Sequence, residues 1–187
     1  MTISFSTALD FVLKHECVFA PGHDGDLDFV ITENVPGDGG GLTKYGIDAA
    51  DHPGVDIAKI SLTEATSIYR AGEWTGCRCG DLPSKIDAAV FDCAVNNGIA
   101  TSGILLQRAL LRCGFVLSVD GEIGDKTVRA ALAEANLHAA DFLSQLLNLR
   151  REHYANIVLH RPAFSKFLKG WLNRVNDLAN CLLNPAA

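Results

Sequence analysis

The sequence lacks the features that mark membrane-spanning and nucleic-acid-binding proteins. No stretch approaches the roughly 18 consecutive apolar residues that a membrane-spanning helix needs, so we expect no stable membrane insertion. Basic residues are in the minority, with 16 Lys and Arg against 22 Asp and Glu and a formal net charge of -6. Because binding to nucleic acid requires a basic surface that neutralises phosphates, we expect no nucleic-acid partner.

We also expect no secretory signal peptide. Charged side chains interrupt the segment from Met1 to Ala20, which has neither a basic start nor an apolar core before a small-residue cleavage site. We therefore expect synthesis in the cytoplasm. Because disulfide frameworks belong to exported proteins, most of the six cysteines should be free thiols.

Several catalytic and metal-binding motifs are absent. The six histidines form no HExxH pattern, no G-x-S-x-G elbow occurs, and no glycine-rich loop ends in Gly-Lys-Ser or Gly-Lys-Thr. Cys77 and Cys79 are too close for the usual zinc spacing and lack a second pair. These absences argue against metalloprotease, serine hydrolase and nucleotide-binding functions, and we expect no metal site.

The composition that is present is that of a globular protein, with 48% hydrophobic and 20% charged residues among 187, enough to bury a core. Apolar residues recur at spacings of three and four, which predicts a mainly α fold. Residues 20–41 are rich in glycine, proline and aspartate, which predicts a loop or short hairpin with Leu27 to Thr32 as its only plausible strand. The predicted helices span residues 5–16, 61–74, 83–97, 102–113, 125–135, 138–159 and 163–183.

Glu16 is the most informative single residue. It falls on the apolar face of the first predicted helix, four residues beyond Val12 and seven beyond Leu9, where the pattern predicts a hydrophobic side chain. Partial burial and the negative end of the helix dipole both favour a protonated carboxyl group. A general acid for glycosidic cleavage needs that state. The pattern alone favours a structural glutamate, paired with a core arginine or capping another segment.

The glycine-rich segment DGGGLTKYGI, from Asp38 to Ile47, is the second candidate. Glycine lets a ligand approach the backbone closely, and Asp38, Thr43 and Tyr45 supply polar groups. A tight turn with a structural pair of Thr43 and Tyr45 explains the same composition equally well. The segment predicts a site only in combination with other motifs.

Asp92 and Asn96 form a third candidate pair. They are four residues apart on the predicted buried helix at 83–97, so they face the same side. They either line a cleft or tie the helix to its neighbours by hydrogen bonds. The structural role is the one that the pattern favours.

These motifs occur in an order that resembles a known family. Glu16 after a short helix, the segment from Asp38 to Ile47 and the sequence FDCAVNNG at residues 91–98 come first. LLQRAL at residues 105–110, VDGEIGDKT at 119–127 and FLKGWLNRV at 167–175 are similar to the predicted peptidoglycan-binding segment that follows in that family. Together they resemble the glycoside hydrolase 108 family of bacterial and phage N-acetylmuramidases over almost the whole chain.

The resemblance implies a lysozyme-like helical fold with a small loop or hairpin lobe beside the active site, and no cofactor. It implies hydrolysis of the β-1,4 bond between N-acetylmuramic acid and N-acetylglucosamine, which is the lysozyme reaction. Residues 1–99 are then the catalytic region. Residues 100–187 are a helical, predicted peptidoglycan-binding region packed on it as one compact unit.

The same resemblance suggests roles for individual residues, with Glu16 as the proton donor. Where the family usually has a glycine pair after this glutamate, the chain has Cys17 and Val18. Asp24, Asp26 and Asp28 are weaker rivals for the second carboxylate. The main candidates beside Glu16 are Asp38 and Thr43 for catalysis, and Tyr45, Asp92 and Asn96 for substrate binding.

Other functions stay open at this point. A catalytically silent peptidoglycan-binding protein would keep the groove without a working acid, and a lytic transglycosylase would use one glutamate and leave a 1,6-anhydro product. A metal or redox protein that uses Cys77, Cys79 and nearby histidines is a further alternative.

The expected partner is the peptidoglycan glycan strand, and we expect a monomer that degrades the cell wall in the periplasm or on the wall itself. Without a signal peptide, a bacteriolytic enzyme would need another route to its substrate. A holin would serve an endolysin. A secretion system would serve an effector, which would also imply an immunity protein.

Overall fold

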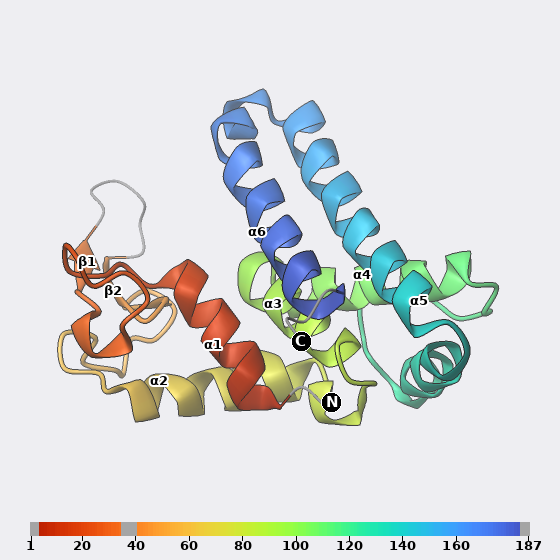
Figure 1. Ribbon diagram of the computed structural model, residues 1–187, viewed down its shortest axis with the longest axis horizontal. Coiled ribbons are helices and arrows are strands. Elements are labelled where there is room, and N and C mark those ends of the chain that lie inside the picture. The colour runs from red at the N-terminus through yellow and green to blue at the C-terminus, as the bar shows by residue number, and fades with distance from the viewer. Residues whose placement is uncertain (1–3, 35–40, 184–187) are drawn as a thin grey trace. The chain divides into compact units, whose positions relative to one another are not determined.

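The computed structural model describes residues 4–34 and 41–183 and divides the chain into two compact units (Figure 1). The N-terminal unit comprises Phe5–Gly72, and the C-terminal unit holds Ser4 and the residues from Glu73 onward. The predicted mainly α class is confirmed, because six α-helices and one small sheet make up the regular structure of the described residues.

The N-terminal unit combines two helices with a three-stranded antiparallel sheet in the order β1-β2-β3. The first helix forms as predicted, because its apolar residues recur on one face, where Ala8, Leu9, Val12 and Leu13 are buried. The elements are α1 (Phe5–Glu16), η1 (Leu27–Phe29), β1 (Glu33–Asn34), β2 (Leu42–Lys44), β3 (Ile47–Asp48) and α2 (Leu62–Tyr69), followed by the π-helical η2 (Arg70–Trp74).

A capping box starts α2, as the sequence predicted. The Ser61 hydroxyl accepts a hydrogen bond from the Glu64 backbone N–H at 3.2 Å, and the Glu64 carboxylate accepts one from the Ser61 N–H at 2.8 Å. The predicted helix at 61–74 is therefore confirmed, with its last five residues in π geometry.

The predicted strand from Leu27 to Thr32 is wrong. Asp26 accepts a hydrogen bond from the Asp28 backbone N–H at 3.1 Å and starts a 3-10 turn over Leu27–Phe29. Such local bonding from an aspartate competes with strand pairing. Only Val30 in this stretch forms a β-bridge, with Phe19, and the first strand begins at Glu33.

The C-terminal unit is a bundle of helices. Its first long helix, α3, is buried along nearly its whole length and ends at Gly98, as predicted. Among the described residues, no helix is long and apolar enough to cross a membrane. The elements are η3 (Cys79–Asp81), α3 (Ile86–Asn97), α4 (Ile99–Arg112), α5 (Asp125–His160), η4 (Pro162–Phe164) and α6 (Ser165–Leu183).

The two helices predicted at 125–135 and 138–159 are joined into α5. The junction is a kink at His138, whose φ of -140° and ψ of 44° are not helical. Neither glycine nor proline interrupts this stretch, so the helix resumes directly after the kink. Figure 1 shows the later part of α5 running beside α6, and the two are joined through η4, which starts at Pro162.

We expect Asp87 to make the stability of the C-terminal unit depend on pH. This carboxyl group in the first turn of α3 is 5% exposed, and burial raises its pKa from an ordinary value of 3.8 to about 6. A raised folded-state pKa contributes stability that is complete below the unfolded value and is lost as the pH rises through about 6. Asparagine stays neutral, so Asp87→Asn avoids the cost of the buried charge. Near neutral pH its free energy of unfolding should be up to roughly 3 kcal/mol higher than that of wild type.

Urea unfolding of both proteins at several pH values tests this prediction. We expect the difference between them to open as the pH rises from about 4 to about 7. A variant that follows the wild-type pH profile throughout would show that Asp87 is not the group responsible.

Candidate active site

Glu16 is the last residue of α1 and is half-buried. The buried face of α1 ends one turn earlier, at Val12 and Leu13. Glu16 therefore lies at the margin of the apolar core. The next residue, Cys17, continues the helical hydrogen bonding, because its N–H donates to the Leu13 carbonyl at 2.9 Å. Glu16 is therefore held on a rigid element at its C-terminal end, where the helix dipole is negative.

The turn between β2 and β3 lies directly against Glu16. Lys44 pairs with Ile47, so the turn consists of Tyr45 and Gly46, whose φ values of 54° and 76° are both positive. These are the φ signs of a type I′ hairpin turn. A Cβ atom added to Gly46 would lie 2.7 Å from the Cβ of Glu16 and would also collide with the Tyr69 hydroxyl. The close approach of the hairpin to Glu16 therefore requires a glycine.

Comparing Gly46→Ala with a control variant should separate the effect of this contact from the effect of backbone strain. The matched control is Gly22→Ala, because Gly22 also has a positive φ, of 84°, but has no atom within 4 Å of an added Cβ. Both variants should lose about 1–2 kcal/mol of folding free energy, because alanine is strained in the left-handed conformation. We expect Gly46→Ala to lose about 1–3 kcal/mol more of folding free energy, because the added methyl group overpacks the contact with Glu16. It should also lose activity. Equal urea-unfolding free energies for the two variants would contradict the packing of the turn on Glu16.

Tyr45 and Tyr69 connect the turn to α2. The Tyr69 hydroxyl donates a hydrogen bond to the Tyr45 carbonyl oxygen at 3.0 Å, and both residues are buried. Burial raises the pKa of the Tyr45 hydroxyl, and Cys17 and Asp28 raise it further, so it stays protonated at neutral pH. The Lys44 ammonium lies 5.1 Å from the centre of the Tyr45 ring and donates to the Ile60 carbonyl at 3.4 Å. Sequence reasoning did not single out Tyr69, since 24 residues separate it from its partner.

Thr43 lies on β2 and is half-buried. It pairs with Glu33 on one side and with Asp48 on the other. The Asp48 carboxylate accepts a hydrogen bond from the Asp51 N–H at 2.8 Å, which orients it at the end of β3. Sequence reasoning did not single out Asp48. Recognising the two-residue turn at Tyr45 and Gly46 would have shown that Asp48 pairs with Thr43.

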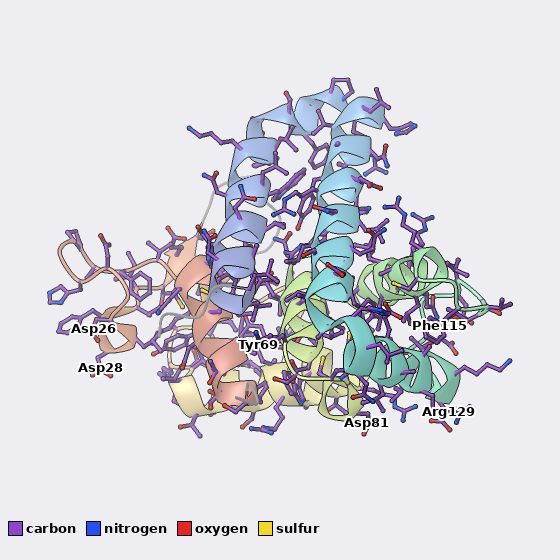
Figure 2. All side chains as sticks on the ribbon, turned by 45° about the vertical axis from the view of Figure 1, so that its right-hand side comes forward. Asp26, Asp28, Tyr69, Asp81, Phe115 and Arg129 are labelled. Carbon is purple, nitrogen blue, oxygen red and sulfur yellow. The ribbon has the colours of Figure 1, made fainter. Side chains whose placement is uncertain are left out.

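The structure describes only some of the candidates for the second carboxylate. Asp38 lies outside the described residues. Asp24, Asp26 and Asp28 are exposed, and Figure 2 shows Asp26 and Asp28 on the segment that follows α1. Asp26 is engaged in capping η1. The role of Asp38 stays a prediction.

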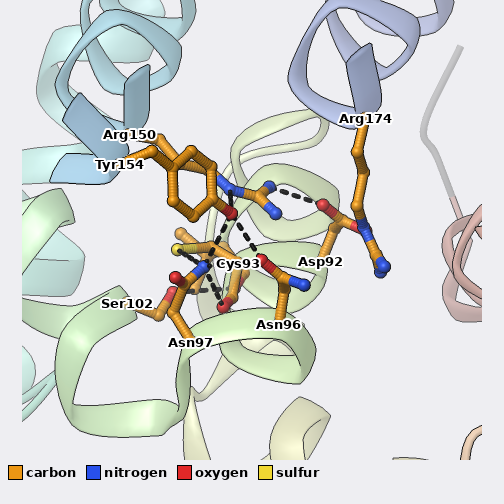
Figure 3. A network of polar contacts seen from close by, with 9 residues as sticks. Asp92, Cys93, Asn96, Asn97, Ser102, Arg150, Tyr154 and Arg174 are labelled. Carbon is orange, nitrogen blue, oxygen red and sulfur yellow. Dashed lines mark hydrogen bonds and ion pairs between the residues drawn. The ribbon is translucent and has the colours of Figure 1, made fainter. Parts of the chain in front are cut away.

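Asp92 and Asn96 belong to the C-terminal unit, whereas Glu16, Thr43 and Tyr45 belong to the N-terminal unit. Asp92 is 1% exposed, and its two carboxylate oxygens bind Arg150 and Arg174 (Figure 3). Burial raises the pKa of Asp92, but the two arginines lower it by more, so the net pKa is below its ordinary value. These ion pairs match the structural alternative for Asp92.

Two family models match this chain. Residues 9–98 match the family model described as glycosyl hydrolase 108, and residues 102–176 match that of a predicted peptidoglycan domain. The chain is thus similar to the glycosyl hydrolase 108 family over residues 9–98. The solved structure of SagA from Brucella abortus is similar, with a TM-score of 0.72 and 26% sequence identity over 96% of this chain and 93% of SagA. No curated protein matches the sequence significantly.

The resemblance predicted from the sequence is thus confirmed, and the matches support a peptidoglycan-degrading glycosidase. The glycosyl hydrolase 108 region contains Glu16 and the turn at Tyr45 and Gly46. Burial, reinforced by Glu16, raises the pKa of Cys17 to about 12. The thiol that replaces the usual glycine is therefore neutral at neutral pH and is a poor nucleophile.

In the region that matches the predicted peptidoglycan domain, the loop before α5 packs against α4. Gln107, which is 1% exposed, donates to the Asp120 carboxylate at 2.7 Å and accepts from the Gly121 N–H at 2.9 Å. A Cβ on Gly103 would collide with the Gly121 carbonyl oxygen. The motif from Val119 to Thr127 is thus clamped onto α4. Among the described residues, no three His, Cys, Asp or Glu side chains gather as metal ligands would.

Proposed function

We propose that this protein is a muramidase that hydrolyses the β-1,4 bond between N-acetylmuramic acid and N-acetylglucosamine in peptidoglycan. The observation that carries the proposal is the position of Glu16 within the glycosyl hydrolase 108 region. It is a half-buried carboxyl group at the end of a rigid helix, packed against a tight glycine turn. Glycosidic cleavage needs such a fixed carboxylic acid beside the scissile bond.

In the proposed reaction Glu16 is the general acid. Its carboxyl proton passes to the glycosidic oxygen as the bond between that oxygen and the anomeric carbon breaks, and the released sugar leaves as an alcohol. The electron-deficient anomeric carbon then takes the oxygen of a water molecule, which gives up one proton to a carboxylate. We propose Asp38 for that second carboxylate.

Thr43 and Tyr45 are the proposed positioning residues on the hairpin. The Thr43 hydroxyl can hold a water or a sugar hydroxyl, because it can both donate and accept. The protonated Tyr45 hydroxyl can donate to a sugar oxygen or to an acetamido carbonyl group. Asn96 is a proposed substrate contact on α3. For Asp92, whose oxygens bind two arginines, we propose an indirect role that operates through α3.

Digestion of purified peptidoglycan in heavy-oxygen water tests the reaction. A muramidase places one heavy oxygen on a new reducing N-acetylmuramic acid end, whereas a lytic transglycosylase forms a 1,6-anhydro end without incorporation. Mass spectrometry of the fragments distinguishes the two. Binding to the wall without released fragments would instead mark a catalytically silent binding protein.

We propose that the enzyme acts on the cell wall. The match to a predicted peptidoglycan domain supports this site of action. Delivery by a holin or a secretion system, and an immunity protein in the second case, stay predictions, as does the division into regions 1–99 and 100–187.

A further inference from the structure

A cavity of about 540 Å³ opens in the C-terminal unit. It lies between the end of α3, the last turns of α5, η4 and α6, and its volume falls in the range of small-ligand sites. Its described lining contains asparagines, histidines, one arginine and aromatic rings, but no acidic residue. In a chain with a formal net charge of -6, such a lining favours an anionic ligand.

Two asparagine side chains at the end of α3 offer complementary hydrogen-bonding groups. The Asn96 Oδ1 accepts from the Tyr154 hydroxyl, and the Asn97 Nδ2 donates to the same hydroxyl oxygen at 2.9 Å (Figure 3). Among the described residues, no partner binds the Asn96 Nδ2 or the Asn97 Oδ1. One donor and one acceptor side by side match an acetamido group, which presents a carbonyl oxygen and an N–H.

The buried ion pair of Asp92 and Arg150 fixes which end of the Asn96 amide faces Tyr154. Asp92 holds Arg150, and the Arg150 Nε donates to the Tyr154 oxygen at 2.9 Å. Because that oxygen already accepts from Arg150 and Asn97, the Tyr154 proton must point to the Asn96 Oδ1. The series of hydrogen bonds from Asp92 through Arg150 and Tyr154 therefore orients the amide of Asn96 before any ligand binds.

Arg161 supplies the positive charge of the cavity. It caps the end of α5, its side chain is exposed, and it has no ion pair with any described residue. Burial, together with Arg108 and Arg150, lowers the pKa of His153, so His153 is neutral at neutral pH. A guanidinium group that is always charged can bind a carboxylate through two parallel hydrogen bonds.

Aromatic rings form one wall of the cavity. Trp171 and Phe164 line it, with ring centres 6.4 Å apart and an angle of 24° between their planes. Tyr154 stacks on Trp171 at 5.1 Å from beneath and holds the indole in place. Flat apolar rings at a polar cavity are suited to the apolar face of a sugar ring.

We propose that this cavity binds an N-acetylmuramic acid unit of a glycan strand. The amides of Asn96 and Asn97 bind its acetamido group, Arg161 binds its lactyl carboxylate, and Phe164 and Trp171 contact its ring. This inference rests on the proposed muramidase function, from which the class of sugar is taken. The peptide stems of the wall also carry amide and carboxylate groups, but they lack the ring that the aromatic wall fits.

Trp171 fluorescence provides a readout local to the cavity. In a Trp74→Phe background, Trp171 is the only tryptophan of the chain. The probe is the disaccharide N-acetylglucosaminyl-N-acetylmuramic acid, which lacks the bond that a muramidase cleaves. The comparison ligands are diacetylchitobiose, which has no carboxylate, and the free stem peptide, which has no sugar.

We expect the disaccharide to bind about tenfold more tightly than diacetylchitobiose, because it adds a charged hydrogen bond. Arg161→Ala should abolish that preference, and Asn96→Asp should weaken binding of both sugars. Arg129→Ala is the matched control, since Arg129 is an exposed arginine on α5 that does not line this cavity (Figure 2). It should bind both sugars as wild type does.

Three results would overturn the proposal: an unchanged preference in Arg161→Ala, a stem peptide that binds as tightly as the disaccharide, or a Trp171 signal that no sugar alters. The muramidase proposal fails separately. A protein that binds as expected but releases no fragments from peptidoglycan refutes the catalytic function and keeps the binding site. A protein that releases fragments without a Trp171 response refutes the binding site alone.

Discussion

Glu16→Gln is expected to fold normally and to clear a peptidoglycan suspension at least about 100- to 10,000-fold more slowly than wild type. Glutamine has nearly the same size and shape, so the packing against Gly46 and the end of α1 is kept. It has no carboxyl proton to give to the glycosidic oxygen. The initial rate of turbidity loss, measured at equal protein concentrations, reports the difference.

Asp10→Asn is the matched control for Glu16→Gln. Asp10 lies on the same helix and is exposed, so the substitution removes one carboxylate from α1 without touching the buried stripe. We expect wild-type rates from it. If both variants lost activity alike, the net charge of α1 would explain the effect, and Glu16 would have no special chemical role.

Asp92→Ala is expected to lower the free energy of unfolding by about 3–5 kcal/mol, because it leaves Arg150 and Arg174 buried without their shared counter-charge. Nη2 of Arg150 already lacks a hydrogen-bond partner among the described residues. Since the pKa of Asp92 is lowered, its contribution is present above the unfolded value and is lost as the pH falls. Urea unfolding near neutral pH measures the loss.

The surface pair between Arg112 and Glu152 provides the comparison. It also joins two helices, α4 and α5, with a distance of 2.7 Å, but both side chains are about half exposed. Glu152→Ala should cost no more than about 1 kcal/mol, since exposed pairs are weak. Equal losses in Asp92→Ala and Glu152→Ala would contradict the importance of the buried network in Figure 3.

The features that the sequence predicted well depend on neighbours along the chain. The helices follow from apolar spacings of three and four, and the capping box follows from Ser61 and Glu64, three residues apart. The burial of α3 follows from a sequence that is apolar almost all round. The order of short motifs was enough to predict the resemblance to the glycosyl hydrolase 108 family.

The features that the sequence did not predict depend on residues far apart or on local competition. Asp92 meets partners 58 and 82 positions away, and no local pattern encodes that choice. A single aspartate side chain, that of Asp26, turned a predicted strand into a 3-10 helix. The contact between Gly46 and Glu16 required the hairpin register, which the loop composition concealed.

The central claim is that Glu16 catalyses hydrolysis of the muramic acid bond. Its most direct test is a mass-spectrometric time course of the muropeptides that wild type and Glu16→Gln release from purified peptidoglycan. We predict fragments with reducing N-acetylmuramic acid ends from wild type and almost none from the variant. The same fragments released at a similar rate by Glu16→Gln would contradict the claim.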